Sequence, residues 1–318
     1  MTKNYLPILF LVLLLNSCSK DDGPGGFIPC TADTLATGWT KMPGTSAPFT
    51  DIFFRNNNNG IRVGADGMQK SADGGLSWTA VDSSRHFVNC YITPNGNIFA
   101  ARHLMPMLYG NLNQQGLTTG SIMAIDFHFL DNNTGYTVVR DFNNSWLYST
   151  LNGGANWVRN NHPMPTPLGS EGYASLHFAT AAKGWVVCGK LVYQVNNDVI
   201  ADSVALPVDK LTCVQSLSAS TVLAGSGSGE IFKSTNGGAS FSPLTRVGTG
   251  EAFMDIHFFS EQLGYASNGN KIYYTSDGGQ TWQTVARICT GIFAEIHFTD
   301  ANHGWGVTQN GDIYRFVR

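Results

Sequence analysis

Four histidines occupy one position of a repeated strand pattern, and three of them follow an acidic residue by two positions. The histidines are His128, His177, His257 and His297, and the acids are Asp126, Asp255 and Glu295. Residues two apart in a β-strand share a face, so each pair places a carboxylate beside an imidazole. Such a pair can act as a general acid or base. Because the pair recurs along the chain, we favour hydrogen bonding near the centre of the fold.

Two Asp-x-Asn-x-Gly segments, at residues 131–135 and 300–304, have the spacing that begins a calcium-binding loop. Both lack the bidentate Glu that such a loop has at its twelfth position, so we interpret them as Asx-turns. The recurring histidines are poorly placed for zinc, because packed sheets lie about 10 Å apart whereas zinc ligands lie about 2 Å from the ion. The sequence therefore predicts neither a metal site nor a cofactor.

Four segments share the pattern Ser/Thr-x-Asp/Asn-Gly-Gly-x-x-aromatic, which we call the Asp box. They span residues 71–78, 150–157, 234–241 and 275–282, with Asp73, Asn152, Asn236 and Asp277 at the third position and Trp78, Trp157, Phe241 and Trp282 at the eighth. The Asp or Asn oxygen can accept backbone N–H groups of its own turn, and glycine supplies a positive φ. The Asp-box residues are therefore expected to be structural.

A second signature, an apolar-x-Phe run with Gly six residues after the Phe, gives the period of the chain. It occurs at Phe54, Phe129, Phe178, Phe258 and Phe298, and degenerate copies centre on Ile92 and Leu217. Copies roughly 40 residues apart are typical of a repeat propeller. Short alternating strands and Gly- and Asn-rich turns fill each copy. We therefore expect an all-β fold, a seven-bladed β-propeller of four-stranded antiparallel blades over residues 36–318.

The last repeat ends before its fourth strand. Residues 38–42 match residues 77–81, each with a tryptophan at the second position. We expect the N-terminal strand to pair with the last blade, with Trp39 near Tyr314. Such pairing would close the ring and remove its exposed sheet edges.

Taken together, these spacings resemble those of the Asp-box (BNR) repeat β-propellers. The resemblance is strongest to the photosystem II stability/assembly factor-like family and weaker to the sialidase-type repeat propellers. It covers residue 36 to the C-terminus, although the second and fourth repeats lack a box. It implies a ring that acts as an assembly or docking factor and implies no cofactor. A photosynthetic role does not follow, because a fold does not fix a function.

The N-terminus has the features of an exported lipoprotein. Lys3 precedes an apolar run at residues 6–15, and residues 15–18, ending in Cys18, resemble a bacterial lipobox. The run is too short to span a bilayer. We expect a signal peptide at residues 1–17, lipidation of Cys18, and a flexible tether at residues 18–35. These features predict anchoring to the bacterial outer membrane, with periplasmic and surface exposure both left open.

Composition argues against one class of partner. The net charge is −3, only 13% of residues are charged, and no Lys/Arg cluster occurs, so nucleic acid is not expected to bind. Five cysteines besides Cys18 cannot all pair within one chain. They are Cys30, Cys90, Cys188, Cys213 and Cys289. Buried free thiols are favoured, and a Cys30–Cys289 bridge near the chain closure is the alternative.

Function is expected where the period breaks, because insertions in repeat proteins form loops. The second repeat replaces its box with residues 102–109, and the longest gap between repeats contains residues 140–146 and 161–165. Met, aromatic and Arg side chains occur there, as in protein-contact surfaces. The candidate partner-binding residues are Arg102, His103, Tyr109, Arg140, Trp146 and His162. Tolerated drift of loop sequences is the alternative.

The sequence favours a non-catalytic, monomeric, lipid-anchored platform that docks or assembles an envelope protein. A surface polysaccharide-binding component is the alternative, since sugars stack on exposed aromatic rings. A sialidase-like hydrolase is less favoured, because residues 54–57 read Phe-Arg-Asn-Asn where that family has Phe-Arg-Ile-Pro. Such an enzyme would be expected to depend on Asp141 or Glu171.

Overall fold

The computed structural model describes residues 30–43, 47–84, 86–102, 105–110, 113–116, 123–140, 144–165, 174–247 and 253–318. The chain divides into two compact units, Met1–Thr31 and Ala32–Arg318. In the first unit only residues 30 and 31 are described. The predicted signal peptide and Cys18, and the tether up to residue 29, therefore lie outside the described residues.

The described strands of the second unit pair in antiparallel fashion and form seven hydrogen-bonded sheets. Three sheets are β3–β6 (Phe49–Phe54, Gly60–Gly64, Gly67–Ser71, Thr79–Asp82), β7–β10 (Phe87–Ile92, Ile98–Arg102, Met105–Gly110, Asn113–Gly116) and β11–β15 (Met123–Phe129, Gly135–Arg140, Asn144–Thr150, Val158–Arg159, Met164–Pro165). Two more are β16–β19 (Ala174–Thr180, Lys183–Cys188, Leu191–Asn196, Val199–Ala205) and β20–β23 (Leu211–Ser216, Val222–Ser226, Ile231–Ser234, Ser242–Pro243). The other two combine β1 (Thr34–Leu35) with β24–β27 (Phe253–Phe258, Gly264–Asn268, Lys271–Thr275, Gln283–Arg287), and β2 (Trp39–Met42) with β28–β30 (Phe293–Asp300, His303–Thr308, Ile313–Val317).

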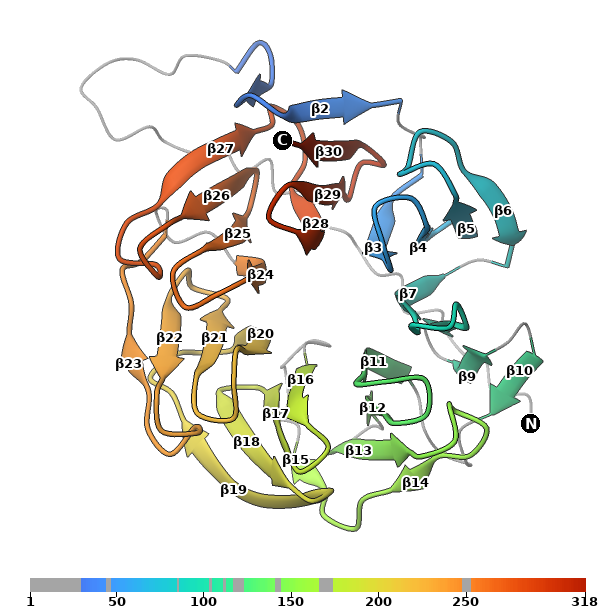
Figure 1. The fold of residues 1–318 in the computed structure, drawn as a ribbon, viewed down its shortest axis with the longest axis vertical. Helices are drawn as coiled ribbons and strands as arrows, with labels where there is room; N and C mark the ends of the chain where they lie inside the picture. The colour runs from blue at the N-terminus through green and yellow to red at the C-terminus, as the bar shows by residue number, and fades with distance from the viewer. Residues whose placement is uncertain are drawn as a thin grey trace, which may run out of the picture. The chain divides into compact units, whose positions relative to one another are not determined.

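These sheets follow one another around a ring, with the first strand of each repeat nearest the centre (Figure 1). Six of them are regular blades, in which at least four residue pairs join the second strand to the third. In the β7–β10 sheet only two pairs join β8 to β9, Ala101↔Leu108 and Arg102↔Met105. The prediction of seven four-stranded blades is therefore wrong: the ring has six blades, and two of its sheets have five strands.

The physical reason for this difference lies in the second repeat. Its spacing matches the period, but residues 102–109, which were expected to replace the Asp box, include the end of β8 and most of β9. Strand β9 contains Pro106, which has no N–H to donate to a ladder. The pairing of β8 with β9 also shifts register between Ala101 and Arg102, so their ladder is short. A period in the sequence therefore counts repeats without showing that each one forms a complete blade. The fifth strands are β1, which pairs with β27, and β15, which pairs with β13.

The Phe/Gly signature marks the ladder between the first and second strands of five blades. In the β16–β19 blade Phe178 pairs with Gly184, and a Cβ on that glycine would lie 2.3 Å from the Phe178 ring. The same close approach occurs at Gly60, Gly135, Gly264 and Gly304. Glycine is required because the aromatic ring lies directly over its α-carbon. In four of the five blades the residue after the glycine is aromatic and packs against the next blade, as where Tyr136 stacks on Phe178 at 3.5 Å between ring centroids.

Each Asp box forms the same turn after the third strand of its blade. In residues 275–282, the Asp277 carboxylate accepts the amide of Thr281 at 2.9 Å, and the Thr275 hydroxyl accepts the amide of Gly279 at 2.9 Å. The other three boxes have equivalent bonds. Gly278 and Gly279 have φ values of +76° and +88°, which only glycine adopts readily. These hydrogen bonds and glycine conformations hold each box turn in the same shape.

Strands from the start of the second unit close the ring. Strand β2 pairs with β30, as predicted, and the register places Trp39 opposite Phe316 and Lys41 opposite Tyr314. Strand β1 pairs with β27 of the preceding blade. Asp33 lies at the junction, where its carboxylate accepts the amide of Cys289 at 2.9 Å and the hydroxyl of Tyr314 at 2.6 Å. The N-terminal segment therefore connects two blades, not one.

The cysteines divide into two groups. Cys90, Cys188 and Cys213 are free and buried, which confirms the prediction of buried thiols for these three. Cys30 and Cys289 are disulfide-bonded. No helix among the described residues has the length and apolar character needed to cross a membrane.

Candidate binding site

Polar side chains on the innermost strands connect each sheet to the next around the centre. They accept backbone N–H groups of the following sheet: Cys90 N donates to Asp51 Oδ2 at 2.7 Å, Leu176 N to Asp126 Oδ2 at 2.9 Å, and Val214 N to Ser175 Oγ at 3.4 Å. Asp51 and Asp126 also accept the amide of their own next residue. These carboxylates therefore fix the distance and register between neighbouring sheets.

The recurring histidines lie on the same strands and also bridge sheets. His177 Nδ1 lies 2.7 Å from Ser216 Oγ, and His297 Nε2 donates to the Phe54 carbonyl at 2.8 Å. The rings of His128 and His177 are in contact, with 4.3 Å between their centroids. The interpretation of the histidines as hydrogen-bonding groups is confirmed for His177 and His297.

Burial sets the protonation of these groups. It raises the pKa of Asp51 to about 6 and those of Asp126 and Asp255 to about 7, and it also raises the pKa of Glu295. It lowers the pKa values of His177 and His297 to about 4 and that of His257 to about 3. The imidazoles are therefore neutral at pH 7, and those of His177 and His297 are hydrogen-bonded to neighbouring sheets. Nowhere in the described part of the chain do three His, Cys, Asp or Glu side chains gather in a way that could hold a metal ion.

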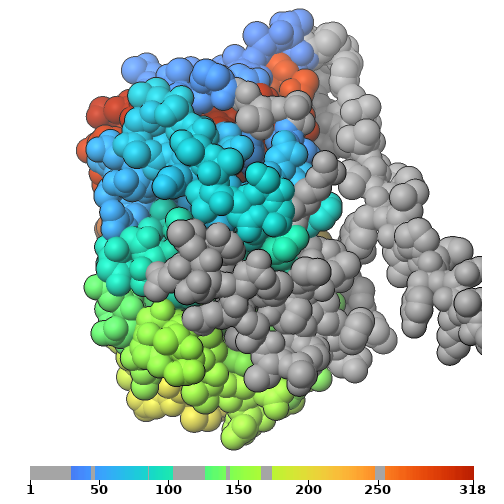
Figure 2. Space-filling view, turned by 90° about the vertical axis from the view of Figure 1, so that its right-hand side faces the viewer, coloured from blue at the N-terminus to red at the C-terminus, as the bar shows by residue number. Residues whose placement is uncertain are grey.

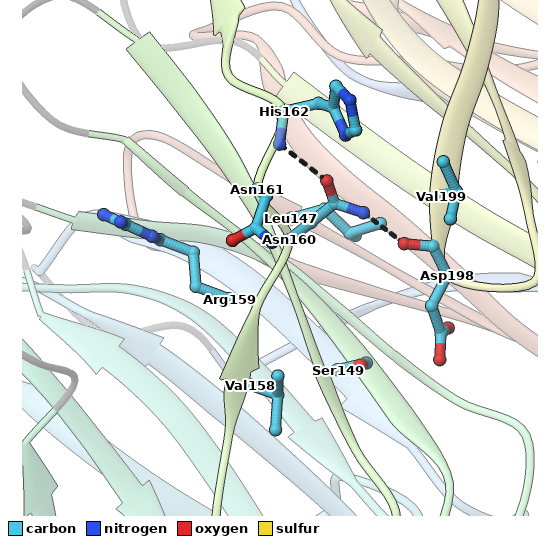
Figure 3. A pocket seen from close by; sticks show the side chains of 9 residues that line it. All are labelled: Leu147, Ser149, Val158, Arg159, Asn160, Asn161, His162, Asp198 and Val199. Atoms are coloured by element: carbon cyan, nitrogen blue, oxygen red, sulfur yellow. Dashed lines mark hydrogen bonds between the residues drawn. The ribbon is translucent and has the colours of Figure 1, made fainter.

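A pocket of about 240 Å³ lies at the perimeter, between the outer strands β14 and β19 of adjacent blades (Figure 3). The β13–β14 side contributes Leu147, Ser149, Val158 and Asn160, and the β18–β19 side contributes Asp198 and Val199. Asn160 joins the two sides, because its Nδ2 donates to the Asp198 carbonyl. Its Oδ1 accepts the amide of His162 at 2.8 Å, which holds that residue beside the pocket.

The β18–β19 hairpin presents Asp198 to this pocket. Its two turn residues, Asn197 and Asp198, have φ values of +48° and +63°. Positive φ at both positions is the geometry of a type I′ turn, which matches the twist of the strands, and Asn and Asp tolerate it best among residues with a Cβ. Asp198 Oδ1 is buried and has no hydrogen-bond partner among the described residues.

The other face of strand β14 carries a contact between an arginine and a tryptophan. The Arg159 guanidinium lies 4.3 Å from the centroid of the Trp146 ring, a cation–π contact. In Figure 3 the Arg159 side chain extends away from Asp198. This stack gives a partner to Trp146, which belongs to none of the Asp boxes.

Two exposed apolar side chains line the pocket, and a third lies in the turn before β14. Val158 is 69% exposed and Val199 47% exposed, and Leu151, in the turn before β14, is 73% exposed. These are three of the five large hydrophobic side chains that are exposed in the described part of the chain. In Figure 2 the sheet that carries β14, in green, forms part of the outer surface beside the blue to cyan strands β3–β8. This part of the perimeter therefore differs from the rest in its apolar character.

The structure brings together only some of the predicted partner-binding residues. His162 lines the pocket, and Trp146 lies under Arg159 on the opposite face of the same sheet. Arg140 pairs with Ser145 in the β12–β13 ladder. His103 and the side chain of Tyr109 lie outside the described residues.

Arg102 belongs to a different environment. It lies in β8 of the irregular sheet, and its guanidinium is 5.6 Å from the centroid of the Phe87 ring.

Sequence reasoning missed Val158, Arg159, Asp198 and Val199. One signal could have identified Val158, the residue directly after the box aromatic. The corresponding residues of the other boxes are Thr79, Ser242 and Gln283, all polar and exposed. Val158 is the one apolar residue at this position among the four boxes.

Comparisons with known proteins identify the fold alone. No protein-family profile matches the sequence, and no curated protein matches it. A solved structure of YCF48 bound to D1 peptide is 19% identical with a TM-score of 0.69, over 92% of this chain and 99% of that chain. YCF48 from Cyanidioschyzon merolae is 17% identical with a TM-score of 0.69, over 88% of this chain and 99% of that chain. The WD40 β-propeller domain of Doa1 is 11% identical with a TM-score of 0.69, over 91% of this chain and 98% of that chain. The β-propeller fold is therefore confirmed.

Proposed function

We propose that this chain is a non-catalytic protein-docking platform, tethered to the bacterial outer membrane by lipid on Cys18. We place its docking surface at the perimeter around the β14–β19 pocket. The observation that carries the proposal is the pair of exposed valines, Val158 and Val199, at the rim of that pocket. Apolar side chains beside a pocket are typical of protein-contact sites. The similarity to YCF48, whose structure is described as bound to a peptide, supports a binding role.

Polysaccharide binding has less support at this place. Sugars are held by stacking on exposed aromatic rings. Among the described residues that line the pocket, the imidazole of His162 is the only aromatic ring. We therefore propose no glycan site here.

The docking surface can be tested by photo-crosslinking in intact cells. Benzoylphenylalanine would be placed at position 158 or 199, and covalent adducts would be identified by mass spectrometry. We expect the same partner protein at both positions, because both side chains face one pocket.

The matched control is position 79, the equivalent exposed position after the box aromatic of the β3–β6 blade. Equal adducts at position 79, or none at 158 and 199, would reject this surface. A Val158→Thr variant has nearly the same shape and restores the polar character found in the other blades. It should weaken partner capture without lowering the melting temperature, because residue 158 is exposed.

The anchor rests on Lys3, the apolar run and the lipobox-like residues that end at Cys18. Metabolic labelling with an alkyne fatty acid should tag the wild-type chain but not Cys18→Ser. Equal labelling of the two chains would contradict lipidation at this cysteine.

A further inference from the structure

We propose that the β14–β19 pocket accepts a lysine or arginine side chain from an extended segment of the docked protein, with Asp198 selecting the positive charge. This proposal rests on the proposed docking function and adds the chemistry of the partner. It follows from the shape of the pocket, the state of the Asp198 carboxylate and the directions of the nearby cations.

The shape of the pocket suits a long side chain with an apolar stem. Leu147, Val158 and Val199 supply apolar surface along its length, and Ser149 and Asp198 supply polar groups. A volume of about 240 Å³ holds a single side chain and is too small for a folded element. Lysine and arginine bury their methylene stems against apolar surface and keep the charged head on polar groups.

The Asp198 carboxylate lacks the donors that such a group normally has. Its Oδ1 is buried without a hydrogen-bond partner, and no cation of the described residues forms an ion pair with it. The Tyr136 hydroxyl lies close to Asp198, since burial and the Asp198 carboxylate together raise the pKa of Tyr136. Its single proton is donated to the Ala181 carbonyl at 3.1 Å, so none is left for Asp198 Oδ1. Buried polar atoms are seldom left unpaired, so a donor from outside the chain is the natural complement. Rotation of the carboxylate about its terminal torsion can bring either oxygen toward that donor.

Two basic side chains also line the pocket, and their positions decide against an acidic ligand. Arg159 stacks on Trp146 and extends away from Asp198 (Figure 3). His162 is exposed and belongs to the segment after β14. In Figure 3 the Asp198 carboxylate points toward the Ser149 side of the pocket, away from Arg159 and His162.

The test uses the full chain in detergent and three fluorescein-labelled nonapeptides, read by fluorescence anisotropy. The peptides share the sequence Gly-Ser-Thr-Val-X-Val-Thr-Ser-Gly, with lysine, norleucine or glutamate at X. Norleucine keeps the stem of lysine without the ammonium group. We expect the lysine peptide to bind about tenfold more tightly than the norleucine peptide, as a charge-assisted hydrogen bond would give.

The Asp198→Asn variant should abolish this preference and leave the affinity for the norleucine peptide unchanged. Asparagine also tolerates a positive φ, so the hairpin keeps its turn. Asp202→Asn is the matched control, since Asp202 is an exposed acid of strand β19, four residues after Asp198, and lies outside the pocket.

Each other outcome overturns the proposal. Equal binding of the lysine and norleucine peptides, or a lysine preference that survives in Asp198→Asn, would exclude Asp198 as the selecting group. Tighter binding of the glutamate peptide would assign charge recognition to Arg159 or His162. If no peptide binds while crosslinks at positions 158 and 199 persist, the basic-side-chain proposal fails and the docking surface stands.

Discussion

Replacing Asp126 by asparagine should destabilise the fold at acid pH but not at alkaline pH. Asp126 Oδ1 accepts the amide of Phe127 at 2.8 Å, and Oδ2 accepts the amide of Leu176 in the next blade at 2.9 Å. Asparagine keeps one acceptor oxygen but presents an NH₂ group at the other position. One of the two bonds is therefore lost, at a cost of about 1–3 kcal/mol for an unsatisfied buried donor.

The charge of Asp126 has the opposite effect. Burial raises its pKa from 3.8 to about 7. Because the folded pKa lies above the unfolded one, the group's contribution to stability is fully present below pH 3.8 and is lost as the pH rises through 7. A pKa difference of this size corresponds to roughly 4 kcal/mol at full ionisation. Asparagine does not titrate, so Asp126→Asn avoids this loss.

The assay is thermal unfolding of both proteins from pH 4.5 to 8.5. We expect the variant to melt below the wild type at pH 4.5 and to equal or exceed it at pH 8.5. With about 2 °C for each kcal/mol in a chain of this size, the difference in Tm should change by several degrees. Titration of the histidines is common to both proteins and largely cancels in that difference.

Asp131→Asn is the control for this experiment. Asp131 is an exposed turn residue whose pKa is lowered by the amides of Thr134 and Asn133. Its variant should show no trend above pH 4.5. A pH-independent difference between Asp126→Asn and the wild type would show that Asp126 titrates near its ordinary pKa, and would refute the reasoning.

Two further predictions concern the packing of the ring. Gly184→Ala should lower the free energy of unfolding by about 1–3 kcal/mol in urea titrations, because its Cβ would lie 2.3 Å from the Phe178 ring. Gly227→Ala, where the added Cβ meets only the flexible side chain of Lys210, should change stability much less, and equal losses would contradict the argument. Trp39→Ala should cost about 3–5 kcal/mol, since this side chain is 6% exposed and its ring lies 5.3 Å from that of Phe316 across the closure. A loss below about 1 kcal/mol in chemical unfolding would mean that β2 contributes little to closing the ring.

Much of the fold was predictable because its recurring contacts are local. The Phe178–Gly184 contact lies within one hairpin, and the Asp277 turn is made by the side chain bonding its own backbone. Residues 38–42 match the outer-strand residues 77–81, and this match predicted the closure of the ring. The error lay in the second repeat, where the period persists but the ladder between β8 and β9 is short. Whether a repeat becomes a regular blade depends on how its second and third strands pair, which the spacing of anchors does not report.

The candidate site shows the complementary limit. Trp146 and His162 were identified from a break in the period, but Val158, Asp198 and Val199 meet only because the hairpin at Asn197 and Asp198 packs beside β14. The pKa values around the centre likewise depend on burial between sheets. The sequence alone determined the repeated strands, their turns and the closing partner, since each follows from the chemistry of neighbouring residues. Only the tertiary structure decided which outer strands face each other and which polar atoms lose their water, because both depend on contacts between residues distant in the chain.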